Sequence, residues 1–186
     1  EVFRGEHKGP DAAFSVANTG KTPLYINTRV SGVPMQANQQ EIQQGIQAHR
    51  ALFTQSGNLI DNKADITLKQ GQTYVLGIRL VCDRDVENLV VVDLLPAGLE
   101  IENPRIDADA IPGEAFKSAV SPSHVEIRDD RLVLAFDALK VGKYQYYYVV
   151  RAVTPGKYQH PPLVAECMYD PSVKGASVVG QLEITE

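Results

Sequence analysis

The chain has 186 residues, a length that fits one domain with a sizeable core better than two domains of average size. Its 18 basic and 23 acidic side chains give a formal net charge of −5, so we expect no nucleic-acid partner and no membrane contact by this segment. The apolar fraction of 44% is that of a globular protein. No apolar run reaches the ~20 residues of a membrane-spanning helix.

The N-terminal part of the chain offers one clear strand pattern. From Leu24 to Val30 apolar and polar residues alternate, which predicts a strand with one face in water. A weaker run near Phe14 predicts another strand. The chain begins at Glu1 without a Met or a basic-then-apolar leader, so we expect a mature segment or a piece of a longer protein, with residues 1–11 as a leading segment.

The clearest strand of the whole chain runs from Thr73 to Cys82. Tyr74, Leu76, Ile78, Leu80 and Cys82 fall on one face, which should point into a core. Ahead of it, Ala48 to Thr54 predicts a weaker strand. The polar stretch from Gln36 to Gln47 carries Gly45 and predicts a loop with at most one helical turn.

The C-terminal half of the chain is rich in strand patterns. Val125 to Phe136 predicts a hairpin whose two-residue turn, Asp129-Asp130, uses side chains that tolerate positive φ. A single helical turn is expected within Ala115–Val120. The remaining predicted strands are Asn88–Leu94, Lys143–Val153, His160–Glu166 and Ser177–Thr185. About nine or ten strands and little helix predict one all-β domain over residues 1–186, an antiparallel β-sandwich with long loops.

No metal site is visible in the sequence. The four histidines, His7, His49, His124 and His160, lie far apart, and we expect each to be solvated or hydrogen-bonded. His124 and Glu126 share one face of a strand, where an exposed polar pair is the ordinary arrangement. We therefore expect no metal and no cofactor.

Acidic pairs are the only residues that suggest hydrolytic chemistry, because two carboxylates can share acid and base roles in glycoside hydrolysis. The candidates are Asp83/Asp85, Glu100/Glu102, Asp107/Asp109 and Asp129/Asp130. Each pair lies beside turn or loop residues, and the chain has no Trp to form a sugar platform. No GxSxG motif is present either. The chain is therefore not expected to be an enzyme.

The cysteines and the tyrosines each allow two interpretations. Cys82 and Cys167 cannot form a disulfide scaffold, and they are either two buried small hydrophobes or one disulfide. Tyr144, Tyr146 and Tyr148 share one strand face, a stripe that is more often the edge of a core than a ligand platform.

Several segments resemble a known family. The stretch Val90–Pro104, VVVDLLPAGLEIENP, is very similar to a stretch of the C-terminal, tenth macroglobulin-like domain of bacterial α2-macroglobulins. The similarity spans about residues 12 to 186. Four further segments agree in order: Pro23 to Pro34, Gly45 to Gly57, Arg128 to Arg131, and Tyr148 to Pro171.

The resemblance implies a fold and a role. The fold would be the fibronectin-III-like or macroglobulin-like sandwich. The chain would be a non-catalytic C-terminal module of a broad-spectrum protease trap that packs against the thioester or thioester-like domain. Target proteases would be met through the full-length protein, in the periplasm or cell envelope, and a lipid anchor on the full-length protein stays open. The alternative is an independent sandwich for adhesion or carbohydrate binding.

A thioester of this family needs a CxEQ motif, and neither cysteine supplies one. Asp83-Arg84-Asp85 follows Cys82, and Met168-Tyr169-Asp170 follows Cys167. The resemblance instead implies that Met168, Tyr169 and Asp170 form a loop that docks on the thioester-type domain. A plain turn with Tyr169 covering the sandwich end is the competing interpretation. This chain has Asp170-Pro171 where the family pattern leads us to expect Arg-Pro, so a salt bridge at that point is not carried over.

Overall fold

The computed structural model describes residues 15–27, 41–60, 65–102, 116, 118 and 120–186. Its contacts group the chain into two units, residues 1–35 and residues 36–186. In the first unit, the Asn18 side chain accepts a hydrogen bond from the Gly20 amide (3.0 Å) and donates one to the Thr22 carbonyl (2.9 Å). These bonds shape a local bend. The single-domain prediction for residues 1–186 stays a prediction.

The strand predicted over Leu24–Val30 is wrong for its described part. Residues 24–27 have no regular secondary structure, and residues 28–30 lie outside the described residues, as does the run near Phe14. Alternation sorts side chains onto two faces, but a strand forms only where a neighbouring backbone pairs with it. The residues described in the first unit contain no such pairing.

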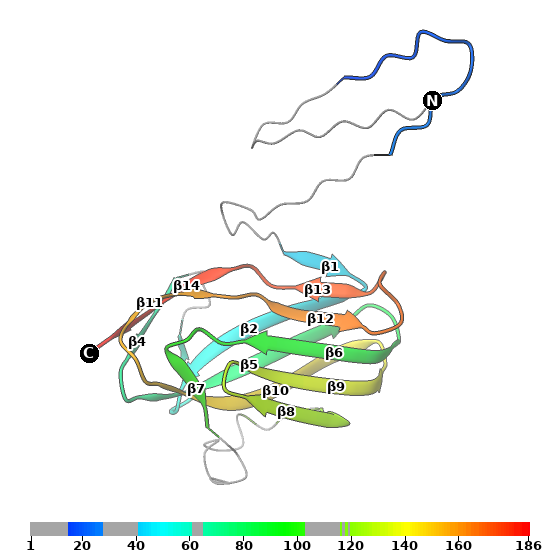
Figure 1. Ribbon diagram of the computed structural model, residues 1–186. Coiled ribbons are helices and arrows are strands. Elements are labelled where there is room, and N and C mark those ends of the chain that lie inside the picture. The colour runs from blue at the N-terminus through cyan, green and yellow to red at the C-terminus, as the bar shows by residue number, and fades with distance from the viewer. Residues whose placement is uncertain (1–14, 28–40, 61–64, 103–115, 117, 119) are drawn as a thin grey trace. The chain divides into compact units, whose positions relative to one another are not determined.

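The described part of the second unit is built from strands (Figure 1). The strands are β1 Ile42–Gln44, β2 Ile46–Thr54, β3 Leu59–Ile60, β4 Asp65–Lys69, β5 Thr73–Cys82, β6 Val86–Leu94, β7 Leu99–Ile101, β8 His124–Arg128, β9 Arg131–Leu139, β10 Gly142–Ala152, β11 Gly156–His160, β12 Leu163–Cys167, β13 Lys174–Ala176 and β14 Gly180–Thr185.

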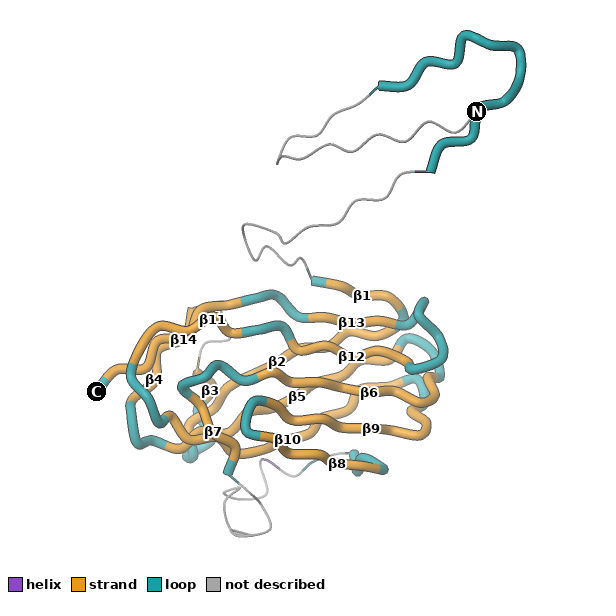
Figure 2. Tube along the Cα trace, viewed as in Figure 1, coloured by secondary structure: helices purple, strands orange, loops and turns teal. Residues whose placement is uncertain are grey.

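Two of the three sheets form the sandwich, and Figure 2 shows their strands stacked as two layers. One sheet has the order β1-β13-β12-β6-β9-β8 and the other β3-β2-β5-β10-β7. A smaller sheet, β11-β14-β4, lies at one end of these layers (Figure 2). Pairing among the described strands is antiparallel except for β14 with β4, which is parallel. The predicted all-β antiparallel sandwich is confirmed, with this one parallel pair added.

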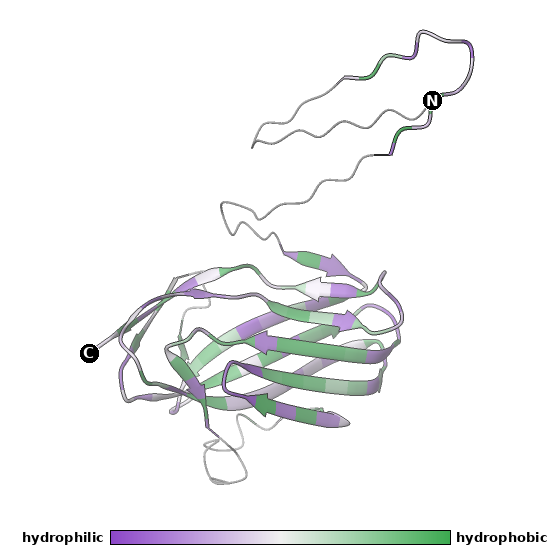
Figure 3. Ribbon diagram, viewed as in Figure 1, coloured by the Kyte–Doolittle hydropathy of each residue, from purple (hydrophilic) through white to green (hydrophobic). Residues whose placement is uncertain are grey.

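The core lies between the two large sheets, as predicted from the alternation in β5. Leu76, Ile78 and Leu80 of β5 are at most 2% exposed, and they share one cluster with Leu89 of β6 and Leu134 of β9. Figure 3 shows the apolar character of these strands. Full burial of such side chains stabilises the fold by about 1.5–3 kcal/mol each, which is why the alternation fixes the face that turns inward.

The hairpin predicted from Val125 to Phe136 is confirmed, with a difference in its turn. Arg128 pairs with Arg131, so Asp129 and Asp130 form a two-residue turn. Neither aspartate takes a positive φ. The turn is therefore not of the mirror-image type that the aspartates suggested.

Two further secondary-structure predictions differ from the structure, and proline and glycine residues are the reasons. The strand predicted over His160–Glu166 is two strands, because Pro161 and Pro162 lack the amide protons that a ladder needs. The loop predicted over Gln36–Gln47 holds β1 and the start of β2, and Gly45, at φ 74°, provides the kink between them. Residues 36–40 of that loop lie outside the described residues.

The predicted helical turn at Ala115–Val120 falls mostly on residues outside those described. Phe116, which is described, is buried and packs edge-on against Phe53 and Tyr147 over the outer face of the five-stranded sheet, with ring centroids 5.3 Å from each. Among the described residues, no helix has the length and apolar character needed to cross a membrane.

Candidate functional site

The predicted docking residues lie in the loop between β12 and β13, here called the 168–172 loop (Met168 to Ser172). Met168 is 63% exposed and Tyr169 is 78% exposed. Burial is the usual state of Met, and a Tyr ring normally packs at least in part against its own domain. Two large, adaptable side chains that point away from the domain are typical of a contact surface.

The loop that carries these side chains is held by its own hydrogen bonds. Asp170 Oδ1 accepts from the Ser172 amide (3.0 Å) and from the Ser172 hydroxyl (2.6 Å). The Val173 amide donates to the Asp170 carbonyl (3.1 Å). The bonds from Ser172 also lower the pKa of the Asp170 carboxyl. Asp170 therefore braces the loop from within.

Neighbouring strands anchor the loop at its root. The Met168 amide donates to the Asn88 carbonyl of β6 (2.9 Å). Asn88 has φ 50°, and it is the one non-glycine residue among those described with a positive φ. Asn tolerates this left-handed conformation better than most residues. The kink turns the Asn88 carbonyl toward the loop and fixes where the loop leaves the sheet.

Another exposed apolar side chain, Val141, lies in a turn at the same end of the sandwich as the 168–172 loop. Asp85, in the turn between β5 and β6, binds the turn between β9 and β10 through Lys140 Nζ (2.7 Å) and the Val141 amide (3.1 Å). Val141 is 62% exposed. The turns that follow β5, β9 and β12 thus share one end of the sandwich, and each is tied by hydrogen bonds.

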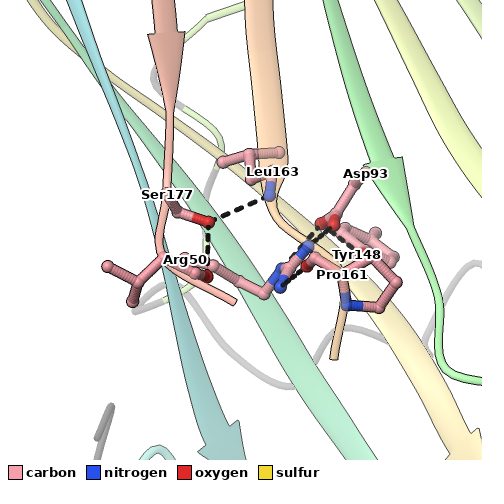
Figure 4. A network of polar contacts seen from close by, with 7 residues as sticks. Arg50, Asp93, Tyr148, Pro161, Leu163 and Ser177 are labelled. Carbon is pink, nitrogen blue, oxygen red and sulfur yellow. Dashed lines mark hydrogen bonds and ion pairs between the residues drawn. The ribbon is translucent and has the colours of Figure 1, made fainter. Parts of the chain in front are cut away.

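A buried polar network joins the two large sheets (Figure 4). Arg50 of β2 forms an ion pair with Asp93 of β6, which is fully buried, and donates through Nη1 to the Pro161 carbonyl (3.0 Å). Tyr148 of β10 donates to Asp93 Oδ2 (2.7 Å). Burial raises the pKa of the Tyr148 hydroxyl well above its usual range. The stripe formed by Tyr144, Tyr146 and Tyr148 is therefore part of the core and its edge, as predicted.

His160 lies beside this network and departs from the expectation for histidines. It is 5% exposed, and its Nε2 has no hydrogen-bond partner among the described residues. Burial, and then the nearby Arg50 charge, lower the pKa of His160 to about 3. The imidazole is therefore neutral at ordinary pH.

The sequence patterns did not single out Arg50 or Asp93. The sequence did contain one clue to a buried polar pair. Asp93 lies inside the apolar run Val90–Leu95, and a charged residue in a strand that is buried on both faces needs a buried partner. The partner, Arg50, is 43 residues from Asp93 in the sequence, so residue spacing could not identify it.

An open cleft of about 430 Å³ lies on one side of this network. Its polar lining includes His49, Arg79, His160 and Ser177. Glu41 also lines the cleft, and its Oε1 is 3.3 Å from His49 Nδ1. Within the described part of the chain, no group of three His, Cys, Asp or Glu side chains could hold a metal ion.

Among the described residues, four carboxylates of the predicted acidic pairs form ion pairs with cationic side chains. Their ion pairs are Asp83 with Arg84, Asp85 with Lys140, Glu102 with Arg151, and Asp130 with Arg131. Asp107 and Asp109 lie outside the described residues, as does His7. Glu126 pairs with Arg128 (2.7 Å) and not with His124.

Cys82 and Cys167 are both free thiols in the structure, and both are buried. Burial raises the pKa of Cys82 to about 11, with a further contribution from Cys167. Burial also raises the pKa of Cys167. Neither thiol is therefore activated as a nucleophile at neutral pH.

These features define a class of protein: a β-sandwich module whose prominent site is an exposed, braced loop. Residues 45–172 match the family model for the bacterial alpha-2-macroglobulin MG10 domain. The chain belongs to this family. It is 32% identical over 177 residues to alpha-2-macroglobulin of Xylella fastidiosa (strain Temecula1), which covers 89% of this chain and 10% of that protein.

Two further relatives agree. Identity to alpha-2-macroglobulin of Escherichia coli (strain K12) is 32% over 184 residues, 92% of this chain and 11% of that protein. The native conformation of the E. coli protein superposes with a TM-score of 0.72 and 29% identity, covering 83% of this chain and 10% of that one. The chain thus spans about a tenth of the length of its curated relatives. The resemblance seen in the sequence is confirmed.

Proposed function

We propose that this domain is a non-catalytic structural and interaction module of a bacterial α2-macroglobulin-like protease trap, with its 168–172 loop docked on the thioester-type domain of the same polypeptide. Family membership supports the larger role. The single observation that carries the docking is that Met168 and Tyr169 are exposed on a loop braced by Asp170 and anchored by Asn88.

Bracing matters because association costs free energy for every mobile group that it orders. A loop that already holds its bound conformation avoids much of this cost. Met and Tyr add apolar area that conforms to a partner surface, and large aromatic anchors often dominate an interface. The Asp170 carboxylate is engaged within the loop, so the proposed contact is mainly apolar.

We further propose that the parent protein acts in the periplasm or cell envelope, where it meets target proteases. The independent adhesion or carbohydrate module is the weaker candidate, because the matching relatives are alpha-2-macroglobulins of which this chain covers about a tenth.

The test uses the full-length parent with Met168→Ala and Tyr169→Ala together. A docking role predicts that the resting form converts to the protease-reacted form without protease, as seen by native electrophoresis. Leu59→Ala is the matched control, since Leu59 is 56% exposed on β3, away from the 168–172 loop. A double variant that keeps the resting form and the protease response of the control would refute the docking role.

A further inference from the structure

We propose that Cys82 and Cys167 are a redox pair that closes to a disulfide between the two large sheets, directly behind the 168–172 loop. Cys82 is the last residue of β5 in the five-stranded sheet, and Cys167 is the last residue of β12 in the six-stranded sheet. Both side chains face the core between these sheets.

The chain itself brings the two strand ends together. β5 and β6 belong to different sheets but are joined by only three residues, Asp83 to Asp85. The start of β6 therefore stays within one short turn of Cys82. Cys167 is paired in register with Leu89 of β6, and the nearby Glu87 main chain partly offsets the rise that burial causes in the pKa of its thiol. Cys82 therefore precedes the sheet-to-sheet turn, and Cys167 lies opposite the part of β6 that follows this turn.

A second observation shows that the two sheets approach each other closely near these strand ends. Cys82 lies opposite Ile46 in the pairing of β5 with β2. The Ile46 carbonyl oxygen would be only 2.8 Å from a Cβ built on Gly175 of β13. Gly175 lies opposite Ala165, two residues before Cys167 on the same face of β12. Because Gly175 lacks a side chain, the two sheets approach closely here, and a disulfide needs Cα atoms about 4.4–6.8 Å apart.

The electrostatic contact between the two thiols agrees with this placement, since Cys167 raises the pKa of Cys82. The chain has only these two cysteines, so an intramolecular bridge has one possible pairing.

The oxidant is a disulfide, either of a thiol–disulfide exchange protein or of oxidised glutathione. The Cys167 thiolate attacks it first, forming a mixed disulfide and releasing one oxidant thiolate. The Cys82 thiolate then attacks the Cys167 sulfur, closing the bridge and releasing the second oxidant thiolate. Two electrons pass from the cysteines to the oxidant, and the two cysteine protons end on the two oxidant thiols. Both cysteines are buried, so the exchange takes place during folding or local opening.

The bridge is tested in the full-length parent by peptide mapping without reduction. The protein is refolded with oxidised glutathione, unfolded in guanidinium, alkylated with iodoacetamide and cut with trypsin. Cys82 falls in the peptide of residues 80–84 and Cys167 in that of residues 158–174. A bridge predicts one linked species, two hydrogens lighter than the sum of the two peptides. Alkylation of both cysteines should fall about tenfold relative to a reduced sample.

The variants Cys82→Ser and Cys167→Ser should each restore alkylation of the remaining cysteine. Full alkylation of both cysteines in the wild type after oxidation would overturn the proposal, and so would links between different chains in place of the internal one. The peptide map of the wild-type protein tests the proposed disulfide even if a serine variant does not fold. The outcome is separate from that of the docking test, because it does not depend on Met168 or Tyr169.

Discussion

Replacing Asp93 by Asn should destabilise the domain more than any exposed charge change. Asp93 is fully buried and accepts hydrogen bonds from the Arg50 guanidinium and from the Tyr148 hydroxyl (2.7 Å). Asn keeps the shape but removes the charge, and it turns an NH₂ group toward donors. Arg50, whose side chain is 8% exposed, is left as an uncompensated buried cation.

Breaking a buried ion pair in this way costs about 3–5 kcal/mol. Domains have total stabilities of only about 5–15 kcal/mol, so the variant should lose a large part of the total. The free energy of unfolding can be measured by urea titration with circular dichroism, since the chain has no Trp.

Two further variants make this test specific. Asp83→Asn removes an exposed pair with Arg84 and should cost at most about 1 kcal/mol. The triple variant Arg50→Met, Asp93→Leu, Tyr148→Phe removes the three polar side chains of the network and should recover most of the loss, to within about 2 kcal/mol of wild type. A cost for Asp93→Asn no larger than for Asp83→Asn, or a triple variant worse than the single one, would refute the reasoning.

Substitutions at three other positions have definite expected outcomes. The pKa of His160 is lowered from 6.5 to about 3, so the unfolded chain binds the proton first. Stability from this group is therefore lost as pH falls below 6.5, by about 1.4 kcal/mol per pH unit, and His160→Gln should remove that part of the slope in urea titrations between pH 6 and 4. Gly98→Ala would place a Cβ 2.5 Å from Tyr158 Cε2 and should cost about 1–3 kcal/mol in thermal unfolding. At Asn88, Gly should be nearly neutral, whereas Val should cost about 1–2 kcal/mol because of its φ of 50°.

For each of these three positions, a specific result would contradict the prediction. Equal pH slopes for wild type and His160→Gln would mean that the imidazole does not sense its burial. Gly142→Ala is the control for Gly98, because its Cβ would meet nothing closer than 3.6 Å, and equal costs would contradict the packing argument. If Asn88→Val were as stable as Asn88→Gly, the left-handed conformation would not constrain that position.

Strands that pair locally and face the core could be predicted from the sequence. The alternation in Thr73–Cys82 gave the correct bounds and the correct inward face. The hairpin around Asp129 was found because its strands are joined by two residues. In both cases the side-chain pattern within one short segment indicates the strand and its inward face, although the partner strands of β5 come from other parts of the chain.

Contacts between distant segments could not be predicted. β4 pairs in parallel with β14, a partner more than a hundred residues away, and no pattern in either segment specifies the other. Arg50 and Asp93 are also far apart in the sequence, and no local pattern identifies them as an ion pair. The alternation that begins at Leu24 led to a wrong strand prediction. An alternating pattern is necessary for a two-faced strand, but it does not provide a partner strand. The docking residues were chosen by resemblance, and their exposure became known only from the structure.

The central claim, that the 168–172 loop contacts a sibling domain, is tested most directly by photocrosslinking. Benzoylphenylalanine at position 169 in the resting full-length parent should crosslink within the same polypeptide, to a peptide of the thioester-type domain, and the crosslink should be lost after protease treatment. The same probe at position 59 should give no such product. A probe at position 169 that reacts only with solvent, or with other molecules, would contradict the claim.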